Sequence, residues 1–298
     1  MDNLRGSLLM VVAMAGFAAE DLFVKLLSQD LPVGQILMML GAGGCAVFAI
    51  AARAQGTQLI SPVLLARPVM LRNLGEVIAA ISYVSALALA DLSTVSAILQ
   101  ATPLAVTLGA ALFMGAQVGW RRWSAILVGL MGVLMIVRPG LDAFDISSVF
   151  AVVSVVGLAI RDLATRTIPS SVSSMQLSCY AFGTMVPTGA VLLMFHGEAA
   201  MPGAMAWAYL LGALIFGVLG YYFIVGAMRI GEIAAVTPFR YARLLFALVL
   251  GMSLLGERPD LWTLIGAAVI IASGLYTLIR EQRVARRAFR QAKPKGPL

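Results

Sequence analysis

Five charged side chains stand inside long apolar stretches of this sequence, and their chemistry is complementary. Glu20 and Glu76 offer carboxylates, whereas Arg72, Arg240 and Arg243 offer guanidinium groups. Charges in such surroundings are costly and are kept where they pair with one another or serve a pathway. A carboxylate would bind an ammonium group, and a guanidinium group would bind a carboxylate through paired hydrogen bonds. The set therefore suits a small molecule that carries both kinds of charge.

Simple ion pairing is the alternative for the same residues. Arg72 and Glu76 are four residues apart, so on a helix they would share one face and could pair with each other. Glu20 and Arg243 could form an ion pair between two helices that holds one conformation together. The two roles are compatible, because a pair that breaks in each cycle is what an alternating-access gate needs.

Uncharged polar side chains extend the candidate site. A hydroxyl or amide group within an apolar stretch needs a hydrogen-bond partner. Pro103 and Pro238 lie close in sequence to two of these residues, and proline frees backbone carbonyls that can line a cavity. The uncharged candidates are Tyr83, Gln100, Tyr180, Tyr221, Tyr222 and Tyr241.

Signatures of catalysis and metal binding are missing from the sequence. It has no His-Glu-x-x-His motif, no nucleophile elbow and no nucleotide-binding loop. Cys45 and Cys179 lack a paired spacing, so we expect packing residues there and neither a disulfide nor a metal site. His196 is expected in a solvated loop. The predictions are no enzyme, no cofactor, no metal and no nucleic acid, since a basic tail drawn to anionic lipid accounts for the net charge of +7.

The elements that must position these residues are membrane-spanning helices. The chain is 61% hydrophobic and only 12% charged, which excludes a soluble protein. A run of roughly 20 apolar residues can cross a bilayer as a helix. We therefore predict an all-α polytopic protein with ten spans, near residues 6–28, 32–52, 68–90, 93–114, 118–138, 146–165, 172–195, 204–228, 232–255 and 259–280.

An internal repeat divides the spans into two groups of five. Residues 16–22 and 157–163 read nearly alike at an offset of 141, and the same offset relates Gln100 to Tyr241. Five is an odd number, so the second group must enter the membrane from the opposite face. The prediction is an inverted 5+5 repeat around a central cavity, with halves at 1–140 and 141–280 and a basic cytoplasmic tail at 281–298.

Charge in the loops predicts the orientation. Lys and Arg concentrate at the ends and loops that share a side with both termini, including the tail after residue 280. Positive charge stays on the cytoplasmic side, so both termini are expected in the cytoplasm and the protein in the plasma (inner) membrane. The same bias explains why Arg161 replaces Glu20 in the repeat, so Arg161 is not expected to bind substrate. Asp21 and Asp162 are expected to pair with Lys25 and Arg166, four residues on.

Two stretches carry a resemblance to a known family. Leu99-Gln100-Ala101-Thr102-Pro103-Leu104 through Gly132, and Ala234-Ala235-Val236-Thr237-Pro238-Phe239 through Gly266, resemble the two repeats of the drug/metabolite transporter superfamily, in its EamA branch. The resemblance covers essentially the full length. It implies a cavity lined by helices 1, 3, 4, 6, 8 and 9, with helices 5 and 10 set apart. One departure is that Gly115 is not followed by an acidic residue, whereas Gly256 is followed by Glu257.

The resemblance leaves several functions open. Aromatic amino-acid exporters of the YddG type look most similar in size and layout, so the favoured hypothesis is a secondary transporter that exports amino acids or similar amphiphilic metabolites. Other members import S-adenosylmethionine or riboflavin, which makes a metabolite importer the alternative. A membrane-integral scaffold or a lipid scramblase is the third hypothesis. Membrane lipids are expected partners beside the small-molecule substrate. The sequence predicts no oligomeric state.

Overall fold

The computed structural model describes residues 2–115, 119–139, 145, 147–169, 172–196, 198–230 and 236–292. Within these ranges the chain forms helices and connecting turns, with no strand, as the apolar runs predict. The first half contains α1 (Asp2–Leu27), α2 (Val33–Ala54), η1 (Pro62–Leu65), α3 (Arg67–Leu89), α4 (Leu92–Leu99), α5 (Thr102–Phe113) and α6 (Trp120–Val137). The second half contains α7 (Ser147–Thr165), α8 (Ser174–His196), α9 (Ala204–Ile230), η2 (Thr237–Tyr241), α11 (Ala242–Leu254) and α12 (Leu261–Ala292).

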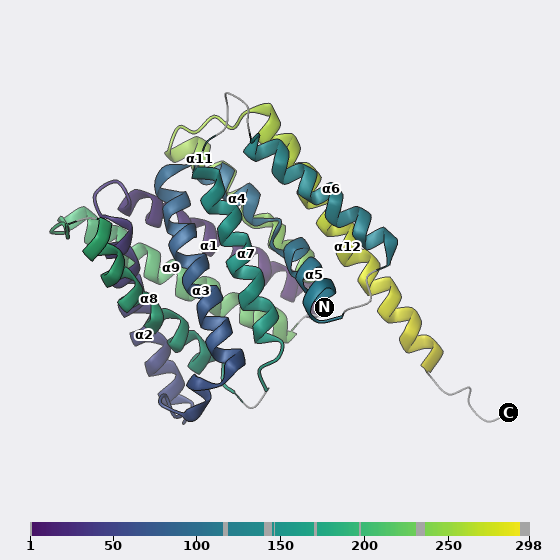
Figure 1. Ribbon diagram of the computed structural model, residues 1–298, viewed down its shortest axis with the longest axis horizontal. Helices are drawn as coiled ribbons and strands as arrows, with labels where there is room; N and C mark the ends of the chain where they lie inside the picture. Colours follow the sequence, from purple (N-terminus) through teal and green to yellow (C-terminus); the bar gives the residue numbers. More distant parts are fainter. Residues whose placement is uncertain are drawn as a thin grey trace.

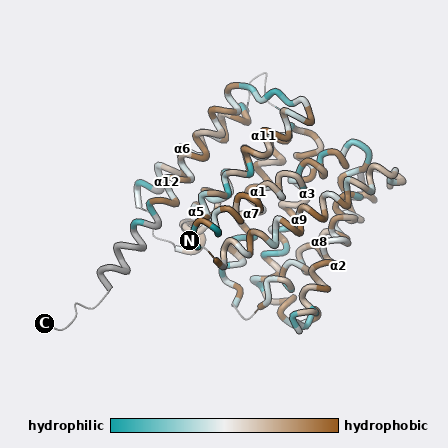
Figure 2. The backbone as a smooth tube through the Cα atoms, turned by 180° about the vertical axis from the view of Figure 1, so that it is seen from behind, coloured by the Kyte–Doolittle hydropathy of each residue, from teal (hydrophilic) through white to brown (hydrophobic). Residues whose placement is uncertain are grey.

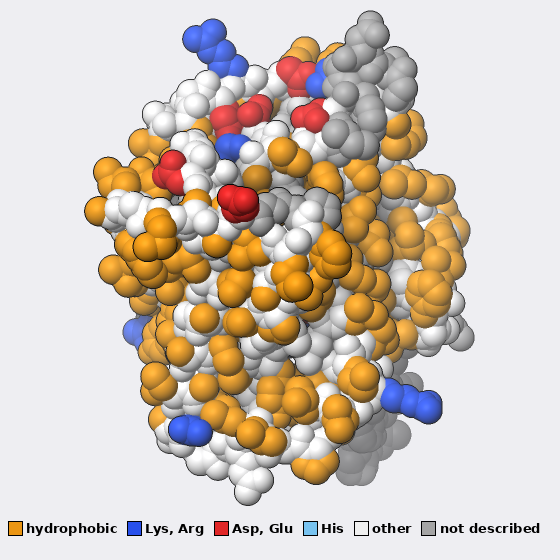
Figure 3. Space-filling view, turned by 60° about the vertical axis from the view of Figure 1, so that its left-hand side comes forward, with side chains coloured by type: hydrophobic (Ala, Val, Ile, Leu, Met, Phe, Trp, Pro, Cys, Tyr) orange, Lys and Arg blue, Asp and Glu red, His pale blue; other side chains and the backbone are white. Residues whose placement is uncertain are grey.

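The helices have the dimensions of membrane spans. Within the described residues, eight helical stretches are long and apolar enough to cross a bilayer, with α4 and α5 counted together as one of them. The shorter α6 and the η2–α11 unit fall within the fifth and ninth predicted spans. Figure 2 shows apolar residues along the helices, and Figure 3 shows apolar side chains over the middle of one face with acidic ones gathered at one end. A polytopic membrane protein is therefore confirmed.

Two spans are interrupted, and the interruptions are equivalent in the two halves. α4 ends at Leu99 and α5 begins at Thr102, while η2 ends at Tyr241 and α11 begins directly after it. Proline lies at the first turn of α5 and of η2, where its missing N–H leaves no helical hydrogen bond broken. The repeat offset of 141 thus places Gln100 and Tyr241 at corresponding joints.

The helices pair across the two halves. The main contacts are α1 with α9, α2 with α8, α3 with α7, and α6 with α12. Exchanging the halves converts the α1–α9 contact into the α7–α3 contact, while α2–α8 and α6–α12 map onto themselves. In Figure 1, α6 and α12 lie side by side at one edge of the bundle, and α2 and α8 at the other. This symmetry is the one that an inverted repeat requires.

The last helix extends beyond its predicted span. α12 continues to Ala292, so the basic segment that starts at 281 begins as a helix. Residues 293–298, the remainder of the predicted tail, lie outside the described residues. The side chain of His196 is also outside them.

Candidate functional site

Two adjoining cavities occupy the centre of the bundle. The larger, of about 520 Å³, is lined by α1, α2, α3, α7, α8 and α9, and the smaller, of about 400 Å³, by α1, α5, α7, η2 and α12. Both are also lined by Arg161, Arg240 and Arg243, so the two spaces meet at these three side chains. Their combined size suits a small organic molecule. The family resemblance set the tenth helix apart, but Gly274 and Thr277 of α12 line the smaller cavity.

Arg243 is held by an aspartate on α1. Its Nε lies 2.9 Å from Oδ2 of Asp21, and its Nη2 lies 2.7 Å from Oδ1. Nη2 also donates to the Tyr83 hydroxyl at 3.0 Å, and the guanidinium group lies 5.5 Å from the centre of the Phe17 ring. The predicted partner Glu20 was wrong, because the preceding residue lies about 100° away around the helix. Arg243 and Asp21 thus join α11 to α1.

Glu20 lines the larger cavity from α1. Its carboxylate lies against Gly217 of α9, where a Cβ atom would be 2.7 Å from Oε1. Among the described residues it forms no hydrogen bond or ion pair. The carboxylate is therefore open to a ligand in the cavity.

On the side of the larger cavity formed by α3 and α7, Arg161 is held by two acidic residues. Its Nη2 lies 2.8 Å from Oδ1 of Asp162, and its Nη1 lies 3.7 Å from Oε1 of Glu76 on α3. Arg161 lines both cavities, although the orientation bias had excluded it from the site. Its equivalence to Glu20 in the repeat was the signal that could have found it. Asp162 takes its neighbour Arg161 as partner, so the predicted pair with Arg166 was wrong.

Arg72 anchors a different contact. Its Nη1 donates to the Leu177 carbonyl at 3.1 Å and to Oδ1 of Asn73 at 3.3 Å. These bonds join α3 to α8. Arg72 and Glu76 therefore have different partners, the Leu177 carbonyl and Arg161, and form no ion pair with each other. Both side chains line the larger cavity.

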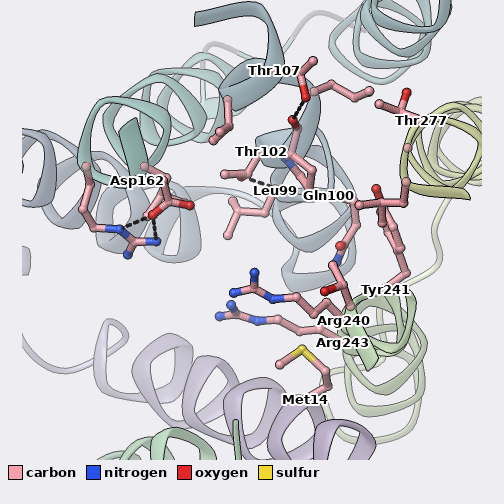
Figure 4. A pocket seen from close by; sticks show the side chains of 18 of the residues that line it. Met14, Leu99, Gln100, Thr102, Thr107, Asp162, Arg240, Tyr241, Arg243 and Thr277 are labelled. Atoms are coloured by element: carbon pink, nitrogen blue, oxygen red, sulfur yellow. Dashed lines mark hydrogen bonds and ion pairs between the residues drawn. The ribbon is translucent and has the colours of Figure 1, made fainter. Parts of the chain in front are cut away.

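Arg240 is a further cation in the lining of the two cavities. It comes from η2 and is exposed to both cavities. Figure 4 shows Arg240 and Arg243 extending in parallel into the same space. Unlike Arg243, Arg240 has no hydrogen bond or ion pair to any residue within the described ranges. A guanidinium group in this state can bind a carboxylate through two parallel hydrogen bonds.

Gln100 and Tyr241 lie at the two helix joints and line the smaller cavity (Figure 4). Both are buried, with exposed fractions of 7% and 6%. The Tyr241 hydroxyl has no hydrogen-bond partner, and no bond to the Gln100 side chain is present among the described residues. Buried polar groups are usually paired, so these two retain unused hydrogen-bonding capacity.

Tyr180 and Tyr222 lie away from both cavities. The Tyr180 hydroxyl donates to the Leu59 carbonyl at 2.6 Å and accepts from Gln176 at 2.7 Å, so it fixes α8 to the segment before η1. Tyr222 is 71% exposed on the outer surface of α9. Its neighbour Tyr221, one helical step away, lines the larger cavity instead.

Glu257 and Lys25 form hydrogen bonds with the backbone where α3 ends and α4 begins. Glu257 accepts from the backbone N–H groups of Leu92 and Ser93 at 2.6 and 3.0 Å, and from the Ser93 hydroxyl at 2.5 Å. It thereby caps α4, whose first N–H groups have no helical partner. Lys25 donates to the carbonyls of Leu87 and Ala90 at 2.9 and 2.6 Å, so the predicted Asp21–Lys25 pair was also wrong. Burial, and then the negative charge of Glu257, raise the pKa of Asp91 above its ordinary value, while Lys25 opposes the rise.

Lining residues of both cavities reach the opposite end of the bundle. Thr165 and Ser174 line the larger cavity where α7 ends and α8 begins, and Arg166 lines the smaller one. These residues and Glu257 lie at opposite ends, because α7 and α11 run in opposite directions through the bundle. The lining of the cavities therefore reaches the end of the bundle that contains the termini, where hydrogen bonds of Gln176 and Tyr180 also join α8 to the segment before η1.

Comparison with known proteins shows the family. The model of the EamA-like transporter family matches residues 4–138 and 146–279, one stretch in each half. A riboflavin transporter of Vibrio cholerae is 29% identical over 194 residues, a stretch that covers 64% of this chain and 64% of that relative. The pseudopaline exporter CntI of Pseudomonas aeruginosa is 27% identical over 90% of this chain and 94% of its own. An S-adenosylmethionine uptake transporter of Rickettsia felis is 23% identical over 69% of each chain.

A solved crystal structure shares the fold. It aligns with a TM-score of 0.62 and 19% identity over 94% of this chain and 98% of that one. The relatives named above transport riboflavin, pseudopaline and S-adenosylmethionine, and do not single out the aromatic amino-acid exporters that the sequence favoured. The two family matches account for nearly all of the membrane-spanning helices, and the chain belongs to the EamA-like transporter family.

Proposed function

We propose that this protein is a secondary transporter that exports a small zwitterionic metabolite, an amino acid or a similar amphiphilic molecule, by alternating access. The observation that carries this proposal is the pair of open charges in the larger cavity. Arg240 and Glu20 both line it, and neither is paired with another described residue. In this proposal Arg240 binds the substrate carboxylate and Glu20 binds its ammonium group.

The other charges support this assignment by being already paired. Arg243 is engaged by Asp21, and Arg161 by Asp162 and Glu76. In the larger cavity, a substrate therefore meets one cation and one anion that have no hydrogen bond or ion pair to a described residue. We infer that the paired groups gate the cavity or fix its shape.

Aromatic rings give the cavity room for an apolar side chain. Phe48 and Phe182 stack with ring centres 5.4 Å apart, and Tyr221 lies edge-on to Phe48 at 4.9 Å. All three line the larger cavity together with Phe17 and Tyr83. Aromatic and apolar lining with a few placed polar groups is typical of small-molecule sites, and it favours an amphiphilic substrate.

The proposed direction of transport follows from the orientation of the protein in the membrane. We place both termini in the cytoplasm and the protein in the plasma membrane, because positive charge concentrates on that side. In this proposal the cavity opens at the end that its lining reaches, so it faces the cytoplasm. A cavity in this state can take up a cytoplasmic substrate for export. Similarity to the exporter CntI over most of both chains agrees with this direction.

Import of a metabolite is the second candidate function. Similarity to riboflavin and S-adenosylmethionine transporters favours it, since these relatives match at comparable identity. A cavity open to the cytoplasm would then be the state that releases substrate. We propose no enzymatic activity and no cofactor for either function.

Ligand-induced thermal stabilisation of the purified protein tests the proposal. The panel contains zwitterionic amino acids, riboflavin and S-adenosylmethionine. A ligand at 100 times its dissociation constant stabilises the folded state by about 2.7 kcal/mol. We expect stabilisation by an amphiphilic amino acid that the variant Arg240→Gln loses. Stabilisation by riboflavin alone, which lacks both a carboxylate and an ammonium group, would overturn the zwitterion proposal and favour the importer.

A further inference from the structure

The two cysteines of the chain meet at the contact between α2 and α8. Cys45 lies on α2 and Cys179 on α8, and their Sγ atoms are 3.5 Å apart. Both are free thiols, and neither lines a cavity. They are 134 positions apart and belong to different halves of the chain, so the sequence spacing predicted no pairing.

Small residues bring the two helices close enough for this contact. A Cβ atom on Gly34 would lie 2.6 Å from the Gly189 carbonyl oxygen, and one on Gly41 would lie 2.9 Å from that of Phe182. A Cβ atom on Gly183 would still be 3.6 Å from the Cys45 sulfur. The α2 and α8 backbones are thus in close contact along the helices, and no larger side chain separates the thiols.

The geometry points to a redox site. We propose that a two-electron oxidant joins Cys45 to Cys179 by a disulfide that links α2 of one half to α8 of the other. A disulfide requires an S–S distance of about 2.05 Å, so from 3.5 Å the sulfurs must approach by roughly 1.5 Å.

The chemistry of the step is balanced with diamide as the oxidant. Each thiol gives up one proton and one electron, and the two sulfurs form the new bond. The N=N group of diamide takes up both protons and both electrons and becomes a hydrazine. The cross-link closes a long segment of chain, and such links constrain the unfolded state most strongly. Oxidation is therefore expected to stabilise the protein.

Thiol counting on the full-length protein tests the site. The purified chain is treated with diamide and denatured, and its remaining thiols are labelled with a maleimide polymer that shifts the band on a non-reducing gel. We expect oxidised wild type to run as an unlabelled monomer and to regain two labels after reduction. The variants Cys45→Ser and Cys179→Ser should each keep their single thiol under the same treatment.

Thermal unfolding gives a second readout that does not depend on transport. The melting temperature of oxidised wild type should rise by several degrees and return on reduction, while neither single-cysteine variant responds. Two labelled thiols after diamide would overturn the proposal, as would loss of thiols only through dimers between chains. Equal oxidation of the single-cysteine variants would overturn it as well, because it would show that the pair is not needed.

Discussion

The two walls of the cavity share a backbone arrangement and differ in their chemistry. On one wall, Gly16 of α1 approaches the α9 backbone at Phe216 and Gly220, and on the other, Gly157 of α7 approaches the α3 backbone at Gly75 and Ala79. These contacts correspond at the repeat offset of 141. The polar side chains beside these glycine contacts differ in residue type between the two walls.

The difference lies in two pairs of equivalent positions. Glu20 corresponds to Arg161 in the repeat, and Gly217 corresponds to Glu76. On the first wall Glu20 lies against Gly217, whereas on the second wall Arg161 lies against Glu76. The first wall consequently keeps an open carboxylate, while the second has a closed pair. Small residues at helix contacts thus maintain the fold in both halves, and a few polar substitutions divide the roles between them.

The largest expected effect concerns the buried ion pair of the first wall. Arg243→Gln leaves the Asp21 carboxylate buried without a partner, and breaking a buried pair costs about 3–5 kcal/mol. Chemical or thermal unfolding in detergent measures the loss. The matched variant on the second wall, Arg161→Gln, should cost less, because the Asp162 side chain that loses its partner is 35% exposed, whereas the Asp21 side chain is 2% exposed. Equal losses would show that the two walls do not differ as described.

A second experiment tests whether the glycine contacts are equivalent. In Gly157→Ala the new methyl group would lie 2.6 Å from the Ala79 backbone nitrogen, whereas in Gly16→Ala it would lie 3.1 Å from the Phe216 carbonyl oxygen. Overpacking costs typically 1–3 kcal/mol. We expect Gly157→Ala to fall in this range and Gly16→Ala to cost less, as measured by melting temperature and yield of folded protein. The reverse order would contradict the backbone geometry.

The family resemblance predicted part of the cavity lining, but not the contribution of α2, α8 and α12, and the contacts between side chains could not be predicted. Hydropathy and the repeat offset gave the spans and the equivalence of Gln100 with Tyr241. The partner of Arg243 depends on rotation around α1, where adjacent residues point about 100° apart, and sequence does not show which of Glu20 and Asp21 faces it. The same ambiguity between neighbours made both Tyr221 and Tyr222 candidates, whereas of these two Tyr221 lines the cavity. Glu257 was missed as the cap of α4 because its partners are distant in sequence.

Arg240 gives the third prediction, which concerns affinity. Arg240→Gln removes a charged hydrogen-bond donor that has no described partner in the protein, so the melting temperature should stay within about 1 °C of wild type. Binding should weaken by about 1.5–3 kcal/mol, roughly 10- to 150-fold, in titrations with a stabilising amino acid. Arg240→Lys keeps the charge but not the planar fork and should give an intermediate loss. Unchanged affinity in Arg240→Gln would remove Arg240 from the substrate site.

The smallest expected effects belong to the two helix joints. Tyr241→Phe removes only a hydroxyl that has no partner, and Gln100→Ala removes an amide without a described bond. If both contact substrate, each should weaken binding by roughly 0.5–1.5 kcal/mol with little change in unfolding temperature. Measuring both quantities on both variants separates the roles, since a loss of stability at constant affinity would mean that these residues support only the helix packing.

Transport in liposomes tests the central claim most directly. Wild type and Arg240→Gln are reconstituted at equal amounts of folded protein, and movement of a radiolabelled amphiphilic amino acid and of a fluorescent lipid is followed in each. The account predicts saturable movement of the amino acid by wild type, its loss in the variant, and no movement of lipid by either. Lipid movement without saturable transport of any amino acid, or full amino-acid transport by the variant, would contradict it.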